Sequence, residues 1–429
     1  MNYILYFLLI TLTTYNDSFL SNSLGAFGFS LLPVMSFLLF FLMCLSGKRI
    51  TYPIFVKKFG RLINYTFILS IVMLVVFFSL NLPTILYGEN VALKILKLYI
   101  TFVSYILFMI VLGELMKSLS MKQLLAPFWW INLSLAIYGM IEYTKIPNAF
   151  LYLHSNQEIY WRVRLLCQES SHSAPIIEIF FILALYYSII VKKSRSYSFI
   201  AMGCLLSQIC ISSSKSLLVV LILSIIFAGW SYIRNISGTK KIVGLIVALI
   251  GLFFIQKYLL TGLLESFSGD LENSTSTVTR SSTNIAGYII GAFFPLGTGF
   301  FGYLYFFPKV LLYLSQNVPS DYNIDELLNI VMSDTDAGVS AQSFFSQSST
   351  YWGLVGSVLF FKYIKKVYSN CLIYCDFRQR LLYKVLFFIV VLHLLTTSNM
   401  EFIFLVTFCL MMKHTSDSSK NEVTGMMNL

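Results

Sequence analysis

A few charged residues that flank long apolar segments could carry chemistry. Arg280 stands in a Ser- and Thr-rich stretch, and no acidic residue falls between Asn273 and Tyr305. Arg162 and Arg164 lie near the end of another polar stretch. Because the planar guanidinium of arginine matches phosphate oxygens, these arginines could hold a phosphorylated substrate. The alternative is an arginine that is solvated at a membrane surface or held in a structural ion pair.

Glu169 is a candidate general base. It stands five residues after Arg164 and is followed by two serines and His172. A carboxylate that is partly removed from water beside an arginine can orient or deprotonate a hydroxyl. The alternative is a salt bridge or a helix N-cap, because Pro175 suits a first helical turn. His172 is more typical of a structural residue, since nothing in the sequence marks a partner for a base.

Other charged residues have two interpretations each. Lys215, in the turn ISSSKS, could hold a substrate phosphate or reach toward lipid phosphates. Glu178 and Glu401 lie at the outer ends of apolar segments and need partners, for which the arginines are candidates. Asp334 and Asp336 have the D-x-D spacing of metal-bound nucleotide-sugar sites, but this spacing is frequent by chance. The sequence contains no P-loop, zinc pattern or Rossmann fingerprint.

The segments that must position these residues are apolar. The chain of 429 residues is 57% hydrophobic and 11% charged, with a mean hydropathy of +0.78. A soluble protein has about 25% charged residues, so we expect a single all-α polytopic membrane domain over residues 1–429. Apolar segments long enough to cross the hydrocarbon recur through the chain. The twelve expected spans are 3–21, 26–46, 63–83, 98–116, 125–143, 174–191, 197–213, 216–233, 242–260, 345–361, 384–398 and 400–413.

The positive-inside rule orients these spans. With both termini in the cytoplasm, 21 of the 30 Lys and Arg residues fall on the cytoplasmic side. Two large loops, 144–173 and 261–344, then face outward, and 414–429 is a cytoplasmic tail. The formal charge of +11 indicates contact with anionic membrane lipids and does not require nucleic acid.

The stretch after Arg280 is punctuated by glycine. Gly291 follows Arg280 by eleven residues, and Gly297, Gly299 and Gly302 follow in turn. Glycine lets the backbone turn or approach a partner closely. Two amphipathic segments, 300–314 and 322–332, could form helices that lie on the membrane surface.

Three of these segments resemble a known family. Three stretches are similar to motifs of the O-antigen polymerase and ligase superfamily: the loop end RVRLLCQESSHSAP, the turn SSSKS, and the segment in which ten residues separate Arg280 from Gly291 before PLGTGFFGY. These bacterial inner-membrane glycosyltransferases carry an Arg…Glu-Pro-Ser-like segment, a Ser-Arg-like turn and an Arg…Pro-Leu-Gly-x-Gly segment. Here Glu169 is followed by Ser170 instead of proline, and Lys215 replaces the arginine of the turn. Gln342 stands where ligases have histidine, which favours a polymerase.

The resemblance implies a GT-C-like membrane glycosyltransferase at the periplasmic face that needs no nucleotide and no metal cofactor. Its substrate would be an oligosaccharide on undecaprenyl diphosphate, and a chain-length regulator protein would be a partner. A hydroxyl of one repeat unit would attack the anomeric carbon of the growing chain. Arg280 and Arg164 would hold the diphosphate and Glu169 would be the base. Substrate contacts would come from Arg162, Lys215, His172 and Gln342.

Other classes of function remain open. A ligase would use the same donor. A flippase or other transporter of the lipid-linked unit would also have about twelve spans, but would more naturally carry charges within its spans. An accessory membrane protein without activity would explain the spans but not the isolated outward arginines.

The topology is testable with fusions to a reporter that is active only outside the cytoplasm. Fusions after Asn156 or Gly269 should give signal, and fusions after Lys193 or Gln379 should give none, because positive charge is retained on the cytoplasmic side. The reverse pattern at either loop would contradict the orientation.

Overall fold

The structure is a computed structural model, which describes most of the chain. The described residues are 1–21, 28–47, 50, 52–145, 150–155, 163–212, 214–233, 275–317, 324–332, 339–397 and 400–427. Three predictions lie outside these residues: the role of Arg162, the span at 242–260 and the D-x-D pair of Asp334 and Asp336.

The described part is almost entirely helical, which confirms the all-α prediction. Its one sheet is a hairpin whose turn residues Tyr87 and Gly88 both have positive φ, as a tight two-residue turn requires. The elements are α1 Asn2–Leu12, α3 Leu32–Leu45, α4 Ile54–Ser79, β1 Ile85–Leu86, β2 Glu89–Asn90, α5 Val91–Met116, α6 Met121–Lys145, η2 Leu151–Leu153, α7 Ser170–Tyr186, η3 Tyr187–Lys192, α8 Arg195–Ser212, α9 Lys215–Ile233, α12 Thr275–Phe293, α13 Gly299–Ser315, α14 Asp325–Met332, α15 Phe344–Ile373, α16 Phe377–Thr396 and α17 Phe402–Met427.

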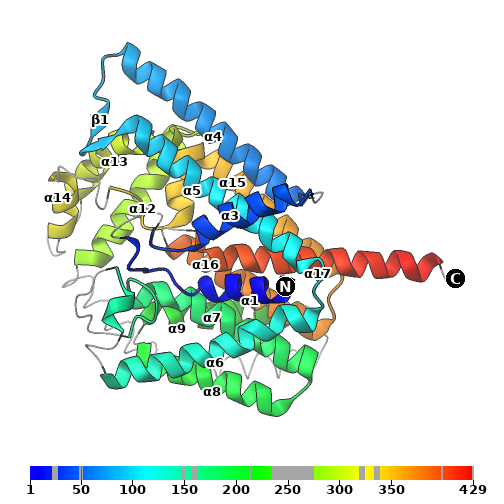
Figure 1. The fold of residues 1–429 in the computed structure, drawn as a ribbon. Coiled ribbons are helices and arrows are strands. Elements are labelled where there is room, and N and C mark those ends of the chain that lie inside the picture. Colours follow the sequence, from blue (N-terminus) through cyan, green and yellow to red (C-terminus); the bar gives the residue numbers. More distant parts are fainter. Residues whose placement is uncertain are drawn as a thin grey trace.

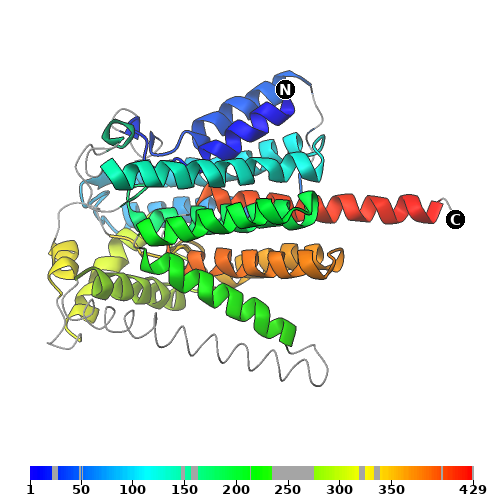
Figure 2. The same cartoon turned by 90° about the horizontal axis from the view of Figure 1, so that it is seen from below.

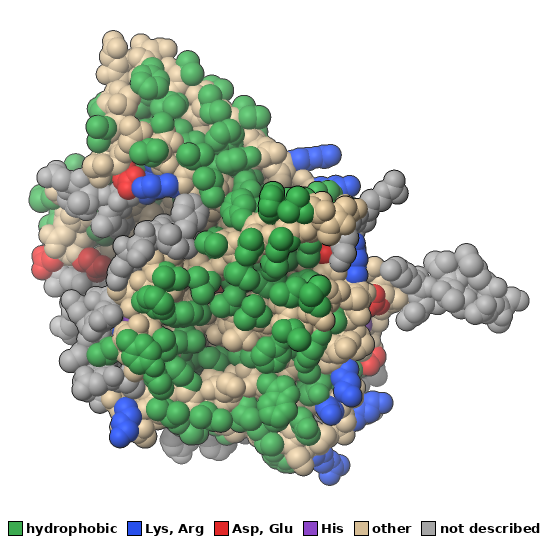
Figure 3. Space-filling view, viewed as in Figure 1, with side chains coloured by type: hydrophobic (Ala, Val, Ile, Leu, Met, Phe, Trp, Pro, Cys, Tyr) green, Lys and Arg blue, Asp and Glu red, His purple; other side chains and the backbone are tan. Residues whose placement is uncertain are grey.

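The long helices lie side by side between two ends of the molecule (Figures 1 and 2). The loop end carries the β1–β2 hairpin, residues 150–155 and 163–169, and helices α12 and α14. The basic end carries residues 46–47 and 52–53 and the turns 117–120, 193–194 and 374–376, and both chain termini lie toward it. Figure 3 shows that most of the Lys and Arg side chains visible on one face gather at the basic end. This separation of charge is the pattern that the positive-inside rule predicts.

Five helices of the described part are long and apolar enough to cross a membrane. Their apolar surface is in part exposed, as it is in a protein that faces lipid. The five are Ile54–Ser79, Val91–Met116, Met121–Lys145, Ser170–Lys192 and Phe377–Thr396. The number of twelve spans stays a prediction.

The first predicted span, 3–21, is too long, because α1 ends at Leu12. Thr13 and Thr14 donate hydrogen bonds to backbone carbonyls one turn back, and the Asn16 amide donates to the Leu166 carbonyl. Short polar side chains offer the backbone such alternatives to a helix. The polar residues at 13–18 therefore end the helix although the segment as a whole is apolar.

Several other helices exceed the predicted boundaries; α5, for example, begins at Val91 instead of 98, and α16 begins at Phe377 instead of 384. α4 begins at Ile54 instead of 63, α15 continues to Ile373 beyond 361, and α17 continues to Met427 through the predicted tail 414–429. Hydropathy marks only the part of a helix that hydrocarbon covers, and long basic side chains can carry the helix on into water. The polar turns at the basic end are consequently shorter than predicted.

The backbone of α15 breaks at Gly353, whose φ of 72° and ψ of 173° are not helical. A Cβ on Gly353 would lie 2.0 Å from the Pro295 carbonyl oxygen. The break frees the carbonyl of Thr350, which accepts hydrogen bonds from Thr298 N at 2.9 Å and Thr298 Oγ1 at 2.8 Å. These two hydrogen bonds hold the loop between α12 and α13 against α15.

Helix α12 packs against the first half of α15 along a face of small residues. A Cβ on Gly287 would meet Ser346 Oγ at 2.2 Å, and one on Gly291 would meet Ser349 at 2.8 Å. Both serines donate hydrogen bonds to α12 carbonyls, Ser346 to Asn284 at 2.6 Å and Ser349 to Gly287 at 2.8 Å. Small residues and hydroxyls are the usual means by which membrane helices approach closely. The close approach expected of the later glycines is confirmed at Gly297 and Gly299, where a Cβ would lie 2.3 Å from the Tyr351 carbonyl oxygen and 2.7 Å from Ser70 Oγ.

The two amphipathic segments expected at 300–314 and 322–332 form α13 and α14. Phe300, Phe301, Phe307 and Leu311 of α13 are fully buried. The Phe300 amide also donates a hydrogen bond to Ser70 Oγ of α4 at 2.8 Å. α13 is therefore a packed part of the bundle and not a helix on its surface, because too many of its faces are apolar.

The α12–α15 contact predicts opposite effects for two glycine substitutions. Gly291→Ala should lower the thermal midpoint of the detergent-solubilised protein, because overpacking costs about 1–3 kcal/mol. Gly203→Ala is the matched control, since no atom lies within 4 Å of its Cβ position. It should leave the midpoint unchanged or raise it, because alanine favours helix by roughly 1 kcal/mol over glycine. Equal midpoints for the two variants would contradict the close contact.

Candidate functional site

Two residues that stand far apart in sequence meet at the loop end. Arg280 lies in the second turn of α12, and its Nη2 is 3.5 Å from Glu169 Oε2 at the start of α7. Their side chains are 48% and 45% exposed. A guanidinium has five N–H donors, so this single long contact leaves donors directed to solvent. The pair is thus accessible to an anionic ligand.

The start of α7 adds hydrogen-bonding groups beside this pair. Glu169 occupies the N-cap position with extended backbone, but its side chain makes no capping bond. Its Oε2 instead accepts from Ser171 Oγ at 3.1 Å. The first backbone amides of a helix lack intrahelical acceptors and favour negative charge. Of the two alternatives to a base, the structure contains the ion pair and not the side-chain cap.

His172 lies beside the same pair. It is in the first turn of α7, and its amide donates to the Glu169 carbonyl at 3.1 Å. The charges of Glu169 and Arg280 both act on its imidazole. Three residues that the sequence singled out, Glu169, His172 and Arg280, are therefore neighbours.

Arg164 lies in a different environment. It belongs to a buried cluster, which we call the clamp, made of Asp17, Glu142, His154, Ser155 and Arg164. Arg164 Nη1 is 3.9 Å from Asp17 Oδ2, and both side chains are almost fully buried. The amide of Arg164 donates to Glu142 Oε1 at 3.0 Å, and the next amide donates to Glu142 Oε2 at 3.0 Å.

Asp17 is the centre of the clamp. Its Oδ2 is 2.7 Å from His154 Nδ1, and its Oδ1 accepts from the hydroxyl and the amide of Ser155. Burial acts to raise the pKa of Asp17, but the bonds from His154 and Ser155 outweigh it and hold that pKa below its usual value. The clamp therefore ties the segment after α1 to both described parts of the loop between α6 and α7.

The other two candidate residues lie on neighbouring elements. Lys215 is the first residue of α9, which packs against α7. Gln342 stands two residues before α15, and the next residue, Ser343, caps that helix by accepting from the Ser346 amide at 3.3 Å. Both candidate side chains are partly buried. Glu169 contacts both Arg280 and Ser171 in the first turn of α7.

Comparisons with protein-family models, curated proteins and solved structures find no match to this chain.

The acids predicted to pair with arginines have other partners. Glu178 Oε2 is 2.9 Å from His393 Nε2, where α7 meets α16, and both side chains are buried. Glu401 Oε2 accepts from Asn16 Nδ2 at 2.7 Å. The structure gives these carboxylates partners other than an arginine, a histidine for Glu178 and an asparagine for Glu401.

Sequence reasoning missed Asp17, Glu142 and His154. The run TTYNDS inside an apolar segment was a usable signal, since four of its six residues are Thr, Asn or Asp. These residues rarely sit in a membrane-spanning helix without partners. No comparable signal marks His154, whose loop position is typical of a solvated residue.

The site can bind an anion and accept a proton. Arg280, the Ser171 hydroxyl and the α7 amides offer donors, and Glu169 offers a carboxylate within the same small region. No group of three His, Cys, Asp or Glu side chains among the described residues could hold a metal ion. The groups at this site can supply hydrogen bonds, charge and proton transfer.

The clamp predicts a pH-dependent loss of stability. Asp17→Asn should lower the thermal midpoint at neutral pH, because removing one partner of a buried pair costs about 3–5 kcal/mol. Since the folded-state pKa of Asp17 lies below its usual value, its ionised form contributes fully above roughly pH 4 and is lost as the pH falls through the lowered pKa. The difference in midpoint between wild type and variant should therefore shrink in acid.

The matched control for this experiment is Glu89→Gln. Glu89 pairs with Lys97 at 3.1 Å on the exposed surface of the loop end. Exposed pairs contribute about 0–1 kcal/mol, so this variant should keep the wild-type midpoint. A midpoint for Asp17→Asn that equals that of the control would contradict a stabilising clamp.

Proposed function

We propose that this protein is a glycosyltransferase that joins lipid-linked oligosaccharide units at its loop end, in the manner of an O-antigen polymerase. The observation that carries the proposal is the exposed pair of Arg280 and Glu169, with His172 beside it. The resemblance of the segments around Glu169, Lys215 and Arg280 to one superfamily supports it. The proposal includes about twelve spans, a bacterial inner membrane and a loop end that faces the periplasm.

The proposed reaction transfers the growing glycan from its lipid diphosphate to an incoming unit. A hydroxyl oxygen of the incoming unit forms a bond to the anomeric carbon, and the bond from that carbon to the diphosphate oxygen breaks. The bonding pair leaves with the lipid diphosphate, and the hydroxyl proton passes to the Glu169 carboxylate. Negative charge develops on the diphosphate, so a preorganised guanidinium is the suitable stabiliser.

The contact between Arg280 and Glu169 fits these two roles. A diphosphate that takes the Arg280 donors would release Glu169 from its ion pair, and the freed carboxylate could then accept the proton. The amides and hydroxyl at the start of α7 would contact a second phosphate oxygen. Arg164, held in the clamp, would support the loop that carries Glu169, and Lys215 and Gln342 would contact the glycan or its phosphate.

One observation favours a transporter as the second candidate. Glu178 and His393 form a buried pair between α7 and α16, and ionisable residues inside a membrane bundle often mark substrate or proton pathways. A ligase is disfavoured because Gln342 occupies the position at which ligases carry histidine.

The decisive experiment measures dimer formation from purified lipid-linked repeat units by membranes with equal amounts of protein. Arg280→Ala should abolish the product, and Arg280→Lys should restore little, because a point charge does not reproduce the planar fork. Glu169→Gln keeps the shape and should lower the rate about 10² to 10⁴ times if Glu169 accepts the proton.

Lys97→Ala is the matched control, since Lys97 is an exposed cation of the loop end with a carboxylate partner at 3.1 Å. It should retain the wild-type rate. A full rate in Arg280→Ala would sink the proposed function. A full rate in Glu169→Gln alone would remove Glu169 as the base and leave the diphosphate role of Arg280 intact. An absence of dimer with wild-type membranes, together with movement of the lipid-linked unit across vesicles that Glu178→Gln abolishes, would favour the transporter.

A further inference from the structure

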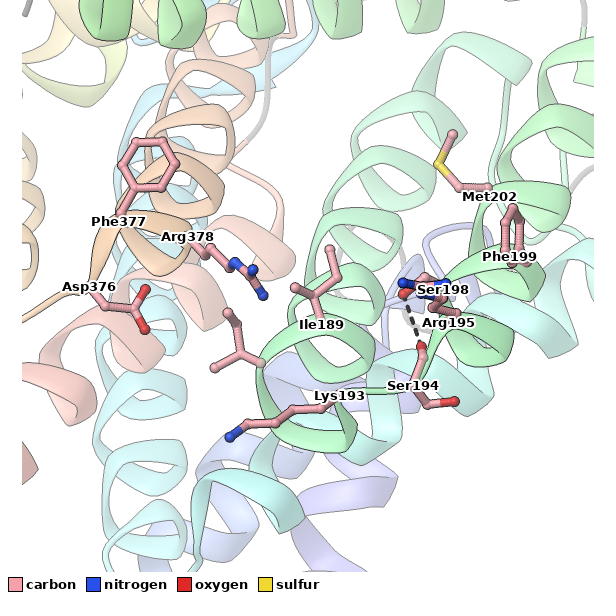
Figure 4. Close-up of a pocket in the computed structure, with 11 residues that line it drawn as sticks. Ile189, Lys193, Ser194, Arg195, Ser198, Phe199, Met202, Asp376, Phe377 and Arg378 are labelled. Atoms are coloured by element: carbon pink, nitrogen blue, oxygen red, sulfur yellow. Dashed lines mark hydrogen bonds between the residues drawn. The ribbon is translucent and has the colours of Figure 1, made fainter. Parts of the chain in front are cut away.

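A hollow lies at the end of the molecule opposite the candidate site. A cavity of about 850 Å³ opens at the basic end between η3, the first turns of α8 and the start of α16 (Figure 4). It shares no residue with the site at the loop end. Its lining combines cationic and apolar side chains. This combination is typical neither of a protein core nor of a solvated surface.

Three cations line the cavity, one from each of its walls. Lys193 follows η3, Arg195 begins α8, and Arg378 is in the first turn of α16. Figure 4 shows Arg378 reaching from α16 toward η3, and Lys193 reaching from the end of η3 back toward α16. In the described part of the chain, no ion pair neutralises any of the three.

The one carboxylate in the lining is engaged elsewhere. Asp376 Oδ1 accepts from the Gln379 amide at 2.8 Å, and Gln379 Oε1 accepts from the Asp376 amide at 3.0 Å. This capping box holds the start of α16 and directs the carboxylate to its own helix. Excess positive charge thus remains in the cavity.

Backbone geometry brings the cations to one place. The last turn before Lys193 is a π-helix, Tyr187–Lys192, and Lys193 has a left-handed φ of 51°. The chain therefore turns sharply into α8, where Ser198 Oγ donates to the Ser194 carbonyl at 3.2 Å. Two helix N-termini, those of α8 and α16, consequently border the same space and add to the positive potential.

Apolar side chains form the rest of the wall and its rim. Phe199 and Phe377 are 74% and 54% exposed, and Ile189 lies between them in the lining. Aromatic rings at such exposure are costly in water, but they are common where a membrane helix meets the lipid headgroup layer. The cavity therefore offers positive charge next to surface that suits acyl chains.

We propose that this cavity binds the phosphate headgroup of an anionic phospholipid, whose acyl chains lie along Phe199 and Phe377. Basic pockets between membrane helices bind anionic headgroups in this way. A soluble phosphate would use the cations but leave the exposed rings uncovered. The inference does not depend on the proposed glycosyltransferase function, because it concerns residues at the other end of the bundle.

The experiment uses native mass spectrometry of the full-length protein in detergent, titrated separately with phosphatidylglycerol and phosphatidylcholine. Wild type should retain phosphatidylglycerol preferentially. Lys193→Ala/Arg378→Ala should weaken phosphatidylglycerol binding about tenfold to 30-fold, because each basic residue near a headgroup contributes roughly a fivefold factor. Phosphatidylcholine binding should not change.

The matched control is Lys362→Ala/Lys365→Ala, which removes the same charge from exposed positions of α15 outside this cavity. It should bind phosphatidylglycerol as wild type does. An equal loss in both double variants would overturn the proposal in favour of a diffuse basic field. Displacement of the lipid by excess inorganic phosphate would also overturn it, in favour of a phosphate site. If the first double variant is poorly folded, Arg378→Gln alone should still show a severalfold loss, and unchanged binding would count against the site.

Discussion

The arrangement of the loop end depends on how the backbone carbonyl of Thr350 is hydrogen-bonded. The break at Gly353 leaves this carbonyl without its helical donor, and an unsatisfied carbonyl in a membrane bundle costs several kcal/mol. Thr298 supplies two donors to it, which fixes the loop after α12 against α15. The contacts of Gly287 and Gly291 then fix the rotation of α12 on α15. The position of Arg280, two turns before Gly287, follows from these contacts.

The clamp gives the other half of the site its position. Asp17 bonds to the segment at His154 and faces Arg164, and Glu142 accepts two amides from the segment that leads to Glu169. The loop before α7 is thus held by buried charged groups, each of which has a hydrogen-bond or ion-pair partner. Arg280 and Glu169 therefore meet because two independent frameworks converge, one through α12 and α15 and one through the clamp.

Hydropathy alone located the cores of α4, α5, α6, α7 and α16, because long apolar runs leave few alternatives to a helix. Hydropathy misplaced several helix ends. The polar run after Leu12 ends α1 early, whereas basic side chains extend α4 and α15. The isolation of Arg280 in sequence marked it correctly as a residue of interest. Its contact with Glu169, 111 residues away, has no periodic signal, because it arises from the break in α15. Arg164 was expected beside Glu169 from sequence proximity, but a left-handed turn at Leu165 and the amides bound by Glu142 direct it into the clamp.

The clamp and the pair of Arg280 and Glu169 differ in how easily their contacts break. Removing a partner from the buried clamp leaves a charge without solvent, so its contacts persist through any cycle of ligand binding. The pair of Arg280 and Glu169 is nearly half exposed and 3.5 Å apart, and such pairs contribute at most about 1 kcal/mol. An incoming anion can therefore displace Glu169 from Arg280 at little cost, and water or ligand hydroxyls can then reach the carboxylate. In the proposed reaction, the weaker of the two networks would react and the stronger one would hold it in position.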